Sequence, residues 1–432
     1  MSNLMLPLKS LAKVSVSNVD KKSVEGEQPV RLCNYTEVYY NAEIHKDMKF
    51  MSATATREQI REFTLQPGDV LVTKDSETSD DIAVPAYVRS CAHQLLCGYH
   101  LAIIRIHSPK VLSRYIYWAM AATSTRQKLA ISATGVTRFG LRRSDLTSVR
   151  IRVPAIQEQR AITELLDTET THIDALIDKK MALIQLLSSR RASITHAAVS
   201  GKSSEYRHFA SSALPWLEER PQHWDEVLLR LVARLGSGHT PSRDHPEWWV
   251  DCTIPWITTG EVKHLRSDRV EYLDESQTRE KISELGLANS AAELHPPGTV
   301  VLCRTAASAG YSAIMKTSMT TSQDFATWTC GMFLRPRFLL LCLRAMRQDL
   351  LGRLAMGSTH KTIYMPEIRS IRIPLPPVAE QEEIVDRAWR QLNRIDHMMD
   401  VLGRQITLLR ERRQALITAA VTGELDVTGN EG

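Results

Sequence analysis

Apolar residues recur at alternating steps of three and four along the last part of the chain. The positions are Leu392, Ile395, Met399, Leu402, Ile406, Leu409 and Leu416, and Arg413 interrupts the pattern. An earlier segment repeats the spacing with Ile173, Ile177, Ile184, Leu187 and Ile194, and places Lys180 and Arg191 at the poorer positions. This spacing is typical of the seam of a coiled coil. We therefore expect two long helical arms that pack on each other.

The ends of both arms carry further helix signals. Prolines precede each arm, and acidic residues gather in the first turns while arginines lie near the far end, as the helix dipole favours. Gly201 and Gly423 stand where left-handed C-terminal caps are expected. An arm of roughly 40 residues spans about 60 Å. We interpret the arms as spacers rather than core elements; ordinary bundle helices are the alternative.

The segments before the arms have a different pattern. Short apolar stretches such as 70–72, 101–104 and 300–302 are separated by turn signals such as Pro67-Gly68, which predicts α+β domains. The expected order is globular domain 1 at 1–154, arm 1 at 155–202, a linker at 203–221, globular domain 2 at 222–378, arm 2 at 379–426 and a tail at 427–432.

An internal repeat links the two halves. Residues 135–201 align with 357–423 at a constant offset of 222, with 21 of 67 positions identical and no gap. Upstream the repeat weakens: Thr36-Glu37-Val38 matches Gly260-Glu261-Val262, and Pro67-Gly68 matches Pro297-Gly298. The chain is therefore a tandem duplication in which a divergent globular part precedes a more similar arm.

Composition and charge exclude several classes. The formal net charge of +5 permits a polyanionic partner without requiring one. Seven cysteines contain no CxxC pair, so structural zinc and a disulfide framework are not expected. The longest apolar run, 338–343, is far too short to cross a bilayer, and we expect a cytoplasmic protein without membrane contact.

The constant-offset repeat begins at two Gly-x-Thr loops, Gly135-Val136-Thr137-Arg138 and Gly357-Ser358-Thr359-His360-Lys361. A threonine beside a cation can donate hydrogen bonds to phosphates or base edges, and glycine permits close backbone approach. A plain helix-capping turn is the alternative interpretation.

Several segments, taken in order, resemble landmarks of the specificity subunits of type I restriction-modification systems. In the second half these are 224–227, Gly236-Ser237-Gly238-His239-Thr240-Pro241-Ser242, 254–257, 297–300, 357–359 and 373–381; the first-half counterparts are 30–39 and 152–159. The resemblance covers nearly the whole chain. The first domain departs from the pattern because it lacks the Gly-x-Thr-Pro-Ser segment.

The resemblance implies a DNA-recognition subunit without catalytic activity. Each globular part would be a target-recognition domain for one half of a bipartite duplex DNA target, and the arms, paired as an antiparallel coiled coil, would fix the distance between the halves. We expect base contacts from loop residues, namely Thr137, Arg138, Arg142, Arg143, His239, Arg304, Gln323, Thr359, His360 and Lys361.

The resemblance also implies partners that carry the chemistry. Adenine-methylating modification subunits would bind S-adenosylmethionine, and motor-nuclease restriction subunits would use ATP and magnesium. In agreement, the chain has no Asn-Pro-Pro-aromatic motif, no phosphate-binding GxxxxGK[ST] loop and no opening Gly-x-Gly-x-x-Gly. We expect no cofactor, metal or catalytic residue in this chain.

Two alternatives remain open. A coiled-coil scaffold or adaptor could use its globular parts to bind proteins instead of DNA. A self-contained methyltransferase or nuclease is disfavoured by the missing motifs.

Overall fold

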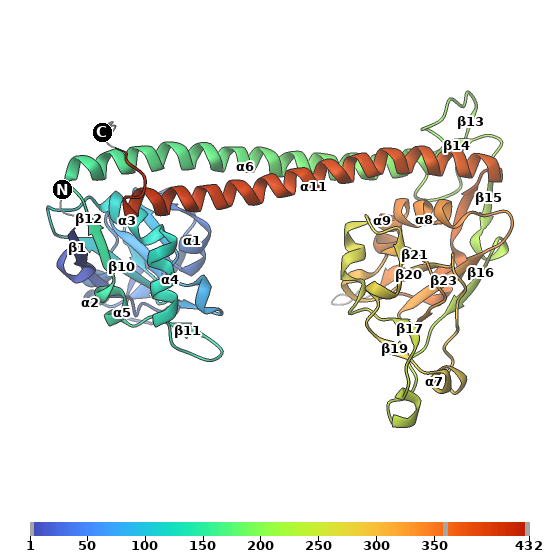
Figure 1. Ribbon diagram of the computed structural model, residues 1–432, viewed down its shortest axis with the longest axis horizontal. Helices are drawn as coiled ribbons and strands as arrows, with labels where there is room; N and C mark the ends of the chain where they lie inside the picture. Colours follow the sequence, from blue (N-terminus) through green and yellow to red (C-terminus); the bar gives the residue numbers. More distant parts are fainter. Residues whose placement is uncertain (1–3, 357–361, 428–432) are drawn as a thin grey trace. The chain divides into compact units, whose positions relative to one another are not determined.

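The computed structural model describes residues 4–356 and 362–427. Its contacts divide the chain into two units, Met1–Lys180 with Arg404–Gly432, and Met181–Gly403. Each unit contains a β-rich domain and part of each of two long helices, α6 (Ile156–Val199) and α11 (Val378–Thr422). Within each unit the segments of α6 and α11 lie side by side (Figure 1).

The first unit is built on a five-stranded sheet in the order β2-β10-β6-β8-β4, beside a three-stranded sheet β5-β3-β9. The strands are β1 (Leu4–Pro7), β2 (Ala12–Val16), β3 (Gln28–Cys33), β4 (Glu43–Ile44), β5 (Met51–Ala55), β6 (Val70–Thr73), β7 (Asp75–Ser76), β8 (Pro85–Val88), β9 (Leu95–Cys97), β10 (Leu101–Ile106), β11 (Phe139–Gly140) and β12 (Arg150–Val153). The helices are α1 (Tyr35–Tyr40), α2 (Arg57–Phe63), α3 (Ser113–Ala121), α4 (Thr123–Ser132) and α5 (Arg143–Ser148), with 3-10 turns η1 (Leu8–Ser10) and η2 (Ser79–Asp81).

The second unit has a five-stranded sheet in the order β16-β23-β20-β21-β18 and a three-stranded sheet β19-β17-β22. The strands are β13 (Phe209–Ser211), β14 (Glu219–Pro221), β15 (Asp225–Leu228), β16 (Ala233–Ser237), β17 (Ile254–Ile257), β18 (Tyr272–Leu273), β19 (Lys281–Ile282), β20 (Val300–Cys303), β21 (Ser312–Met315), β22 (Thr320–Thr321), β23 (Phe325–Cys330), β24 (Ala355–Met356), β25 (Thr362–Ile363) and β26 (Arg372–Leu375). The helices are α7 (Glu284–Ala288), α8 (Pro336–Ala345), α9 (Arg347–Asp349) and α10 (Met365–Ser370), with the short turns η3 (Leu229–Leu231), η4 (Pro246–Trp249), η5 (Val262–Ser267), η6 (Glu275–Gln277), η7 (Ala306–Ser308) and η8 (Leu350–Leu354).

The two domains share one topology. In the large sheet the edge strand pairs in parallel with its neighbour in both units, as β4 with β8 and β18 with β21, and the other pairs are antiparallel. In the small sheet the central strand has one antiparallel and one parallel neighbour in both units. The duplication therefore extends through the regions where the sequence repeat is weak, and the predicted α+β class is confirmed.

Apolar strands and one amphipathic helix supply the core of each domain. All four residues of β6 and all four of β20 are buried. Helix α8 begins with Pro336 at its first turn, and its apolar run 338–343 is completely buried against the sheet. Each large apolar side chain fully buried in this way contributes about 1.5–3 kcal/mol relative to exposure.

The seam positions of both arms are buried or half-buried. Ile173, Leu392 and Ile395 are among the most buried, and Ile184, Leu187, Met399, Leu402, Leu409 and Leu416 are partly covered. Gly201 and Gly423 have φ values of +74° and +84°, which confirms the expected left-handed caps. Ala198 and Val199 also belong to the core of the second unit, and Ala420 and Val421 to that of the first. The expectation that the arms are spacers outside the cores is therefore wrong for their ends, because small apolar residues there belong to the domain cores.

The arginines that interrupt the seams pair with aspartates on the opposite helix. Arg191 on α6 lies 2.9 Å from the Asp396 carboxylate on α11, and Arg413 on α11 lies 2.9 Å from the Asp174 carboxylate on α6. Both residue pairs are related by the offset of 222. The helices run antiparallel, since Asp174 faces Arg413 while the later residue Lys180 donates to Gln405 at 2.7 Å.

A buried glutamine fixes the start of each arm to its domain. The Gln159 side chain accepts a hydrogen bond from the Leu112 amide and donates to the Lys110 and Pro154 carbonyls. The Gln381 side chain makes the same three contacts in the second unit, with the Arg335 amide and the Phe333 and Pro376 carbonyls. Neither glutamine is exposed. These matched contacts explain why the Glu-Gln pair recurs in both halves of the sequence.

The segment expected to be a linker, 203–221, carries a hairpin of β13 and β14 and packs on the second unit. Leu214 and Leu217 are buried, and the Tyr206 hydroxyl donates to Glu380 at 2.5 Å. The segment is therefore an integral part of the second unit.

Candidate nucleic-acid interface

A polar cluster lies at the adjoining ends of β6 and β10 in the first unit. Lys74 follows β6, and Tyr99 and His100 precede β10. The Lys74 amide donates to the His100 carbonyl at 3.0 Å, and the Lys74 ammonium lies 2.8 Å from Asp75 and 4.6 Å from the centre of the Tyr99 ring. The His100 imidazole lies 2.8 Å from the Asp75 carboxylate. The cluster thus holds a cation and an aromatic ring together at one edge of the sheet.

The second unit has an equivalent cluster at the ends of β20 and β23. The Arg304 amide donates to the Asp324 carbonyl at 2.7 Å, and the Thr305 hydroxyl donates to the Asp324 carboxylate at 2.9 Å. The Arg304 guanidinium donates to the Gln323 carbonyl, and the Gln323 side chain accepts from the Thr240 hydroxyl at 2.7 Å. The structure therefore brings two expected site residues, Arg304 and Gln323, into contact.

The clusters correspond position by position. Lys74 and Arg304 are related by the offset of 230 that also relates the Pro-Gly turns before β6 and β20. Tyr99 and Gln323 each lie two residues before the matching strands β10 and β23. Lys74 and Tyr99 were not identified from the sequence. Carrying Arg304 back by 230 positions would have pointed to Lys74, whereas nothing in the first half resembles the sequence around Gln323.

A projecting loop stands beside the first cluster. Thr137 and Arg138 are exposed between α4 and β11, and Gly135 has a φ of +148°. A Cβ at Gly135 would lie 1.9 Å from the Arg138 carbonyl oxygen, so only glycine fits this turn. The Leu141 amide then donates to the Lys74 carbonyl at 2.8 Å, which ties the loop to the cluster.

The same tie exists in the second unit, where the Ile363 amide donates to the Arg304 carbonyl at 2.9 Å. In the sequence, Ile363 comes two residues after Lys361, the last of the expected contact residues Thr359, His360 and Lys361. Those three expected contact residues lie outside the described residues.

The remaining expected residues differ in their surroundings. Arg142 precedes α5 and lies 3.3 Å from Asp145, with most of its side chain in solvent, and Arg143 is exposed in the first turn of α5. His239 is exposed beside Gly238, whose Cβ would lie 1.9 Å from the Thr321 carbonyl oxygen. His239 thus sits on a backbone segment that is held close to β22.

Burial and hydrogen bonds hold the Arg304 side chain of the second cluster in place. The Arg304 guanidinium is half-buried, and this burial lowers the pKa of Arg304 below its ordinary value although the side chain stays charged at neutral pH. Its hydrogen bonds to the Gln323 and Ile363 carbonyls hold it in place. Arg304 therefore positions the neighbouring loops, while Gln323 presents its amide to solvent.

Among residues 4–356 and 362–427, no group of three His, Cys, Asp or Glu side chains could hold a metal ion. Burial raises the pKa of Cys303, the thiol next to Arg304, to about 11, so it is protonated and unreactive at neutral pH. Within the same ranges, no helix combines the length and apolar character that crossing a bilayer requires.

Comparisons with known proteins agree with this arrangement. Residues 221–398 match the family described as type I restriction modification DNA specificity domain. The chain is 28% identical over 166 residues to the MjaIX specificity subunit of Methanocaldococcus jannaschii. The aligned region covers 38% of this chain and only 37% of that protein. It is 21% identical to the EcoBI and EcoKI specificity subunits of Escherichia coli, over 88% of this chain and 78% and 79% of theirs.

Solved structures extend the likeness to the whole fold. A chain solved in work on complex assembly and conformational transition of the type I R-M system matches with a TM-score of 0.69 and 15% identity, over 98% of both chains. The HsdS subunit of Thermoanaerobacter tengcongensis matches with a TM-score of 0.50 and 16% identity, over 98% of this chain and 97% of that one. Residues 221–398 thus match the DNA specificity domain of type I restriction-modification systems, and the chain as a whole is similar in sequence and fold to specificity subunits of these systems.

Proposed function

We propose that this chain is the specificity subunit of a type I restriction-modification system and that it reads a bipartite duplex DNA target, with residues 1–154 recognising one half and residues 222–378 the other. The observation that carries the proposal is the recurrence of a polar cluster at the same sheet edge in both units, hydrogen-bonded in each to the segment that follows the expected Gly-x-Thr residues in sequence. Recognition of this kind requires side chains that reach base edges from a rigid support.

The contacts would differ between the halves. In the first domain the exposed Tyr99 joins Thr137, Arg138, Arg142 and Arg143 as a candidate contact, while Lys74, which is buried and paired with Asp75, supports the Tyr99 ring. In the second domain Gln323 and His239 join Thr359, His360 and Lys361. A glutamine amide can bond bidentately to adenine, and a lysine can bond to guanine, each discriminating by about 1–3 kcal/mol. The Arg304 guanidinium holds the segment that carries Gln323 in place through its hydrogen bond to the Gln323 carbonyl.

The paired arms would set the distance between the half-sites. Reciprocal Arg-Asp pairs on antiparallel helices support a pseudo-twofold relation, which would present the two domains to opposite strands of the target. The chain would work in the cytoplasm with adenine-methylating modification subunits and motor-nuclease restriction subunits, which would carry S-adenosylmethionine, ATP and magnesium.

Genome-wide mapping of methyladenine tests this proposal. The chain is co-expressed with its modification subunit in a host without such modification, and the wild type should produce one split motif. Gln323→Ala should relax specificity only in one half of the motif, and Tyr99→Ala only in the other. Gln391→Ala, an exposed change on α11, is the matched control and should leave the motif unchanged. An intact copurifying complex that yields no motif would favour the scaffold alternative.

Arm length gives a second test. Seven residues inserted after Lys180 and seven after Gly403 preserve the seam and lengthen both arms by about 10.5 Å. At about 3.4 Å per base pair the gap in the motif should grow by about three base pairs. A longer gap with unchanged half-sites supports the spacer role, and an unchanged gap contradicts it.

A further inference from the structure

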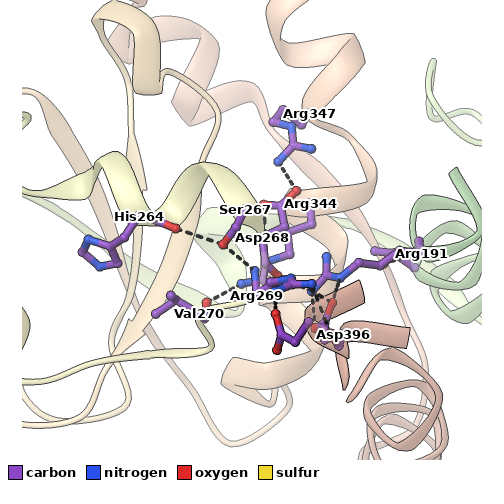
Figure 2. A network of polar contacts seen from close by, with 11 residues as sticks. Arg191, His264, Ser267, Asp268, Arg269, Val270, Arg344, Arg347 and Asp396 are labelled. Atoms are coloured by element: carbon purple, nitrogen blue, oxygen red, sulfur yellow. Dashed lines mark hydrogen bonds and ion pairs between the residues drawn. The ribbon is translucent and has the colours of Figure 1, made fainter. Parts of the chain in front are cut away.

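A cavity of about 650 Å³ in the second unit is lined by several positively charged side chains. It lies between α6, η5, α8 and α9, near the network shown in Figure 2. Its cationic lining residues are Arg191, Lys202, Arg266, Arg344 and Arg347. Asp268 is the one carboxylate among the described residues that line it.

The nearby carboxylates do not balance these cations. Asp268 accepts from Arg347 and lies 3.8 Å from the Arg344 Nε, so it serves two arginines. Arg191 pairs with Asp396, which also lies 3.4 Å from Arg269 (Figure 2). Arg269 has Asp400 as a further partner. No carboxylate is paired with Arg266 among the described residues. The cavity wall therefore keeps a positive excess.

Arg266 and Lys202 are the most available of these cations. The Arg266 Nε donates to the Ser308 hydroxyl at 3.0 Å, and within the described ranges Arg266 forms no ion pair. Lys202 lies 3.6 Å from Glu219, and both side chains are about half-exposed. Two cationic groups at the cavity can thus turn toward a ligand at little structural cost.

Arg344 contributes a buried positive charge. Only 4% of its side chain is exposed, and its Nε has no hydrogen-bond partner among the described residues. Burial lowers the pKa of Arg344 to about 10; attraction to Asp268 opposes this shift, and repulsion from Arg191 and Arg347 adds to it. Arg344 remains charged at neutral pH, so an anion in the cavity would relieve this repulsion.

The fold itself does not require these cations. The offset of 223 that aligns Arg114 with Arg337 places Ala121 at the position of Arg344 and Ser124 at that of Arg347. Lys202 corresponds to Glu424 at the offset of 222. The first unit has the same topology without this cluster, so the cluster is a specific feature of the second unit.

We propose that this cavity binds the phosphate group of a nucleotide-sized anion. Guanidinium groups match phosphate oxygens through paired hydrogen bonds, and the volume lies within the range of small-molecule sites. The inference rests on the cavity and its charges, and not on the proposed recognition of DNA. The phosphate could come from a free nucleotide or from a nucleic-acid backbone, which offer the same chemistry.

Titration calorimetry on the full chain tests the proposal, with inorganic phosphate, pyrophosphate and ATP in chloride buffer at constant ionic strength. Pyrophosphate and ATP should bind saturably, and Arg266→Gln and Lys202→Gln should each weaken binding about tenfold or more. Arg230→Gln removes one exposed arginine outside the cavity and should change nothing. Arg266→Lys, which keeps the charge, should restore part of the affinity.

A labelled DNA duplex distinguishes the two sources. If free anions bind and Arg266→Gln leaves duplex binding unchanged, the ligand is a free phosphate compound. If free anions give no saturable heat while Arg266→Gln weakens duplex binding and lowers the salt slope by about one, the phosphate belongs to the nucleic acid. If the cavity variants change the binding of neither the phosphate compounds nor the duplex, the proposal is overturned.

Discussion

The buried glutamine that joins the second arm to its domain offers a quantitative test of the fold. Gln381→Leu keeps the side-chain volume but removes three hydrogen bonds, and it leaves the Arg335 amide and the Phe333 and Pro376 carbonyls without this partner. Each orphaned group costs about 1–2 kcal/mol, and the added apolar burial offsets part of the loss. We expect a net destabilisation of about 2–4 kcal/mol.

The effect should be local and measurable. In a unit of roughly 220 residues, this change lowers the melting temperature by about 5–15 °C, which differential scanning calorimetry detects. Hydrogen exchange should show lost protection of the Arg335 amide and of the start of α11. Gln391→Leu, an exposed change on the same helix, is the control and should shift stability by less than about 0.5 kcal/mol. Equal melting temperatures for the two variants would refute the reasoning.

Two further predictions concern the second unit. Gly238→Ala should destabilise it by at least about 2 kcal/mol in thermal melts, because the new Cβ would lie 1.9 Å from the Thr321 carbonyl oxygen, whereas Gly260→Ala, with its nearest neighbour at 3.9 Å, should be nearly neutral. Burial lowers the pKa of His295 below its ordinary 6.5, so the folded state resists protonation and stability present above about pH 6.5 should fall as the pH drops below it. His295→Gln should reduce this loss of stability at low pH, measured as the free energy of unfolding in urea titrations, and the exposed His239→Gln should not. An unchanged loss in His295→Gln would assign the pH dependence to other groups.

The sequence predicts the arms well because their constraints are local. Seam spacing, the glycine caps and the recurring Glu-Gln pair each leave a mark at fixed positions. The structure places the seam and the Glu-Gln pairs on α6 and α11, and the two glycines just after these helices. The hairpin at 203–221 was missed, since two strands of three residues leave no periodic signal.

The shared domain topology could not be obtained in the same way. Sheet pairing depends on contacts between residues far apart in sequence, and many side chains can satisfy one buried strand. Val70 and Val300 keep their equivalent places although the surrounding sequences have diverged. For the same reason the sequence does not predict a role for Lys74. Its counterpart Arg304 is recognised from motifs of the second unit, and the first unit lacks these motifs.

The seam arginines show how a departure from the apolar pattern can specify the fold. A partly buried ion pair adds little net stability, because removing two charges from water offsets most of their attraction. The ion pair instead disfavours other directions and registers in which the two helices could pack. Parallel arms in register would place Arg191 beside Arg413 and Asp174 beside Asp396, so like charges would meet inside the seam. Antiparallel packing turns both repulsions into 2.9 Å ion pairs, and a slip by one turn would break both at once. The polar interruptions therefore select the direction and register of the arms, while the apolar seam supplies most of the stability.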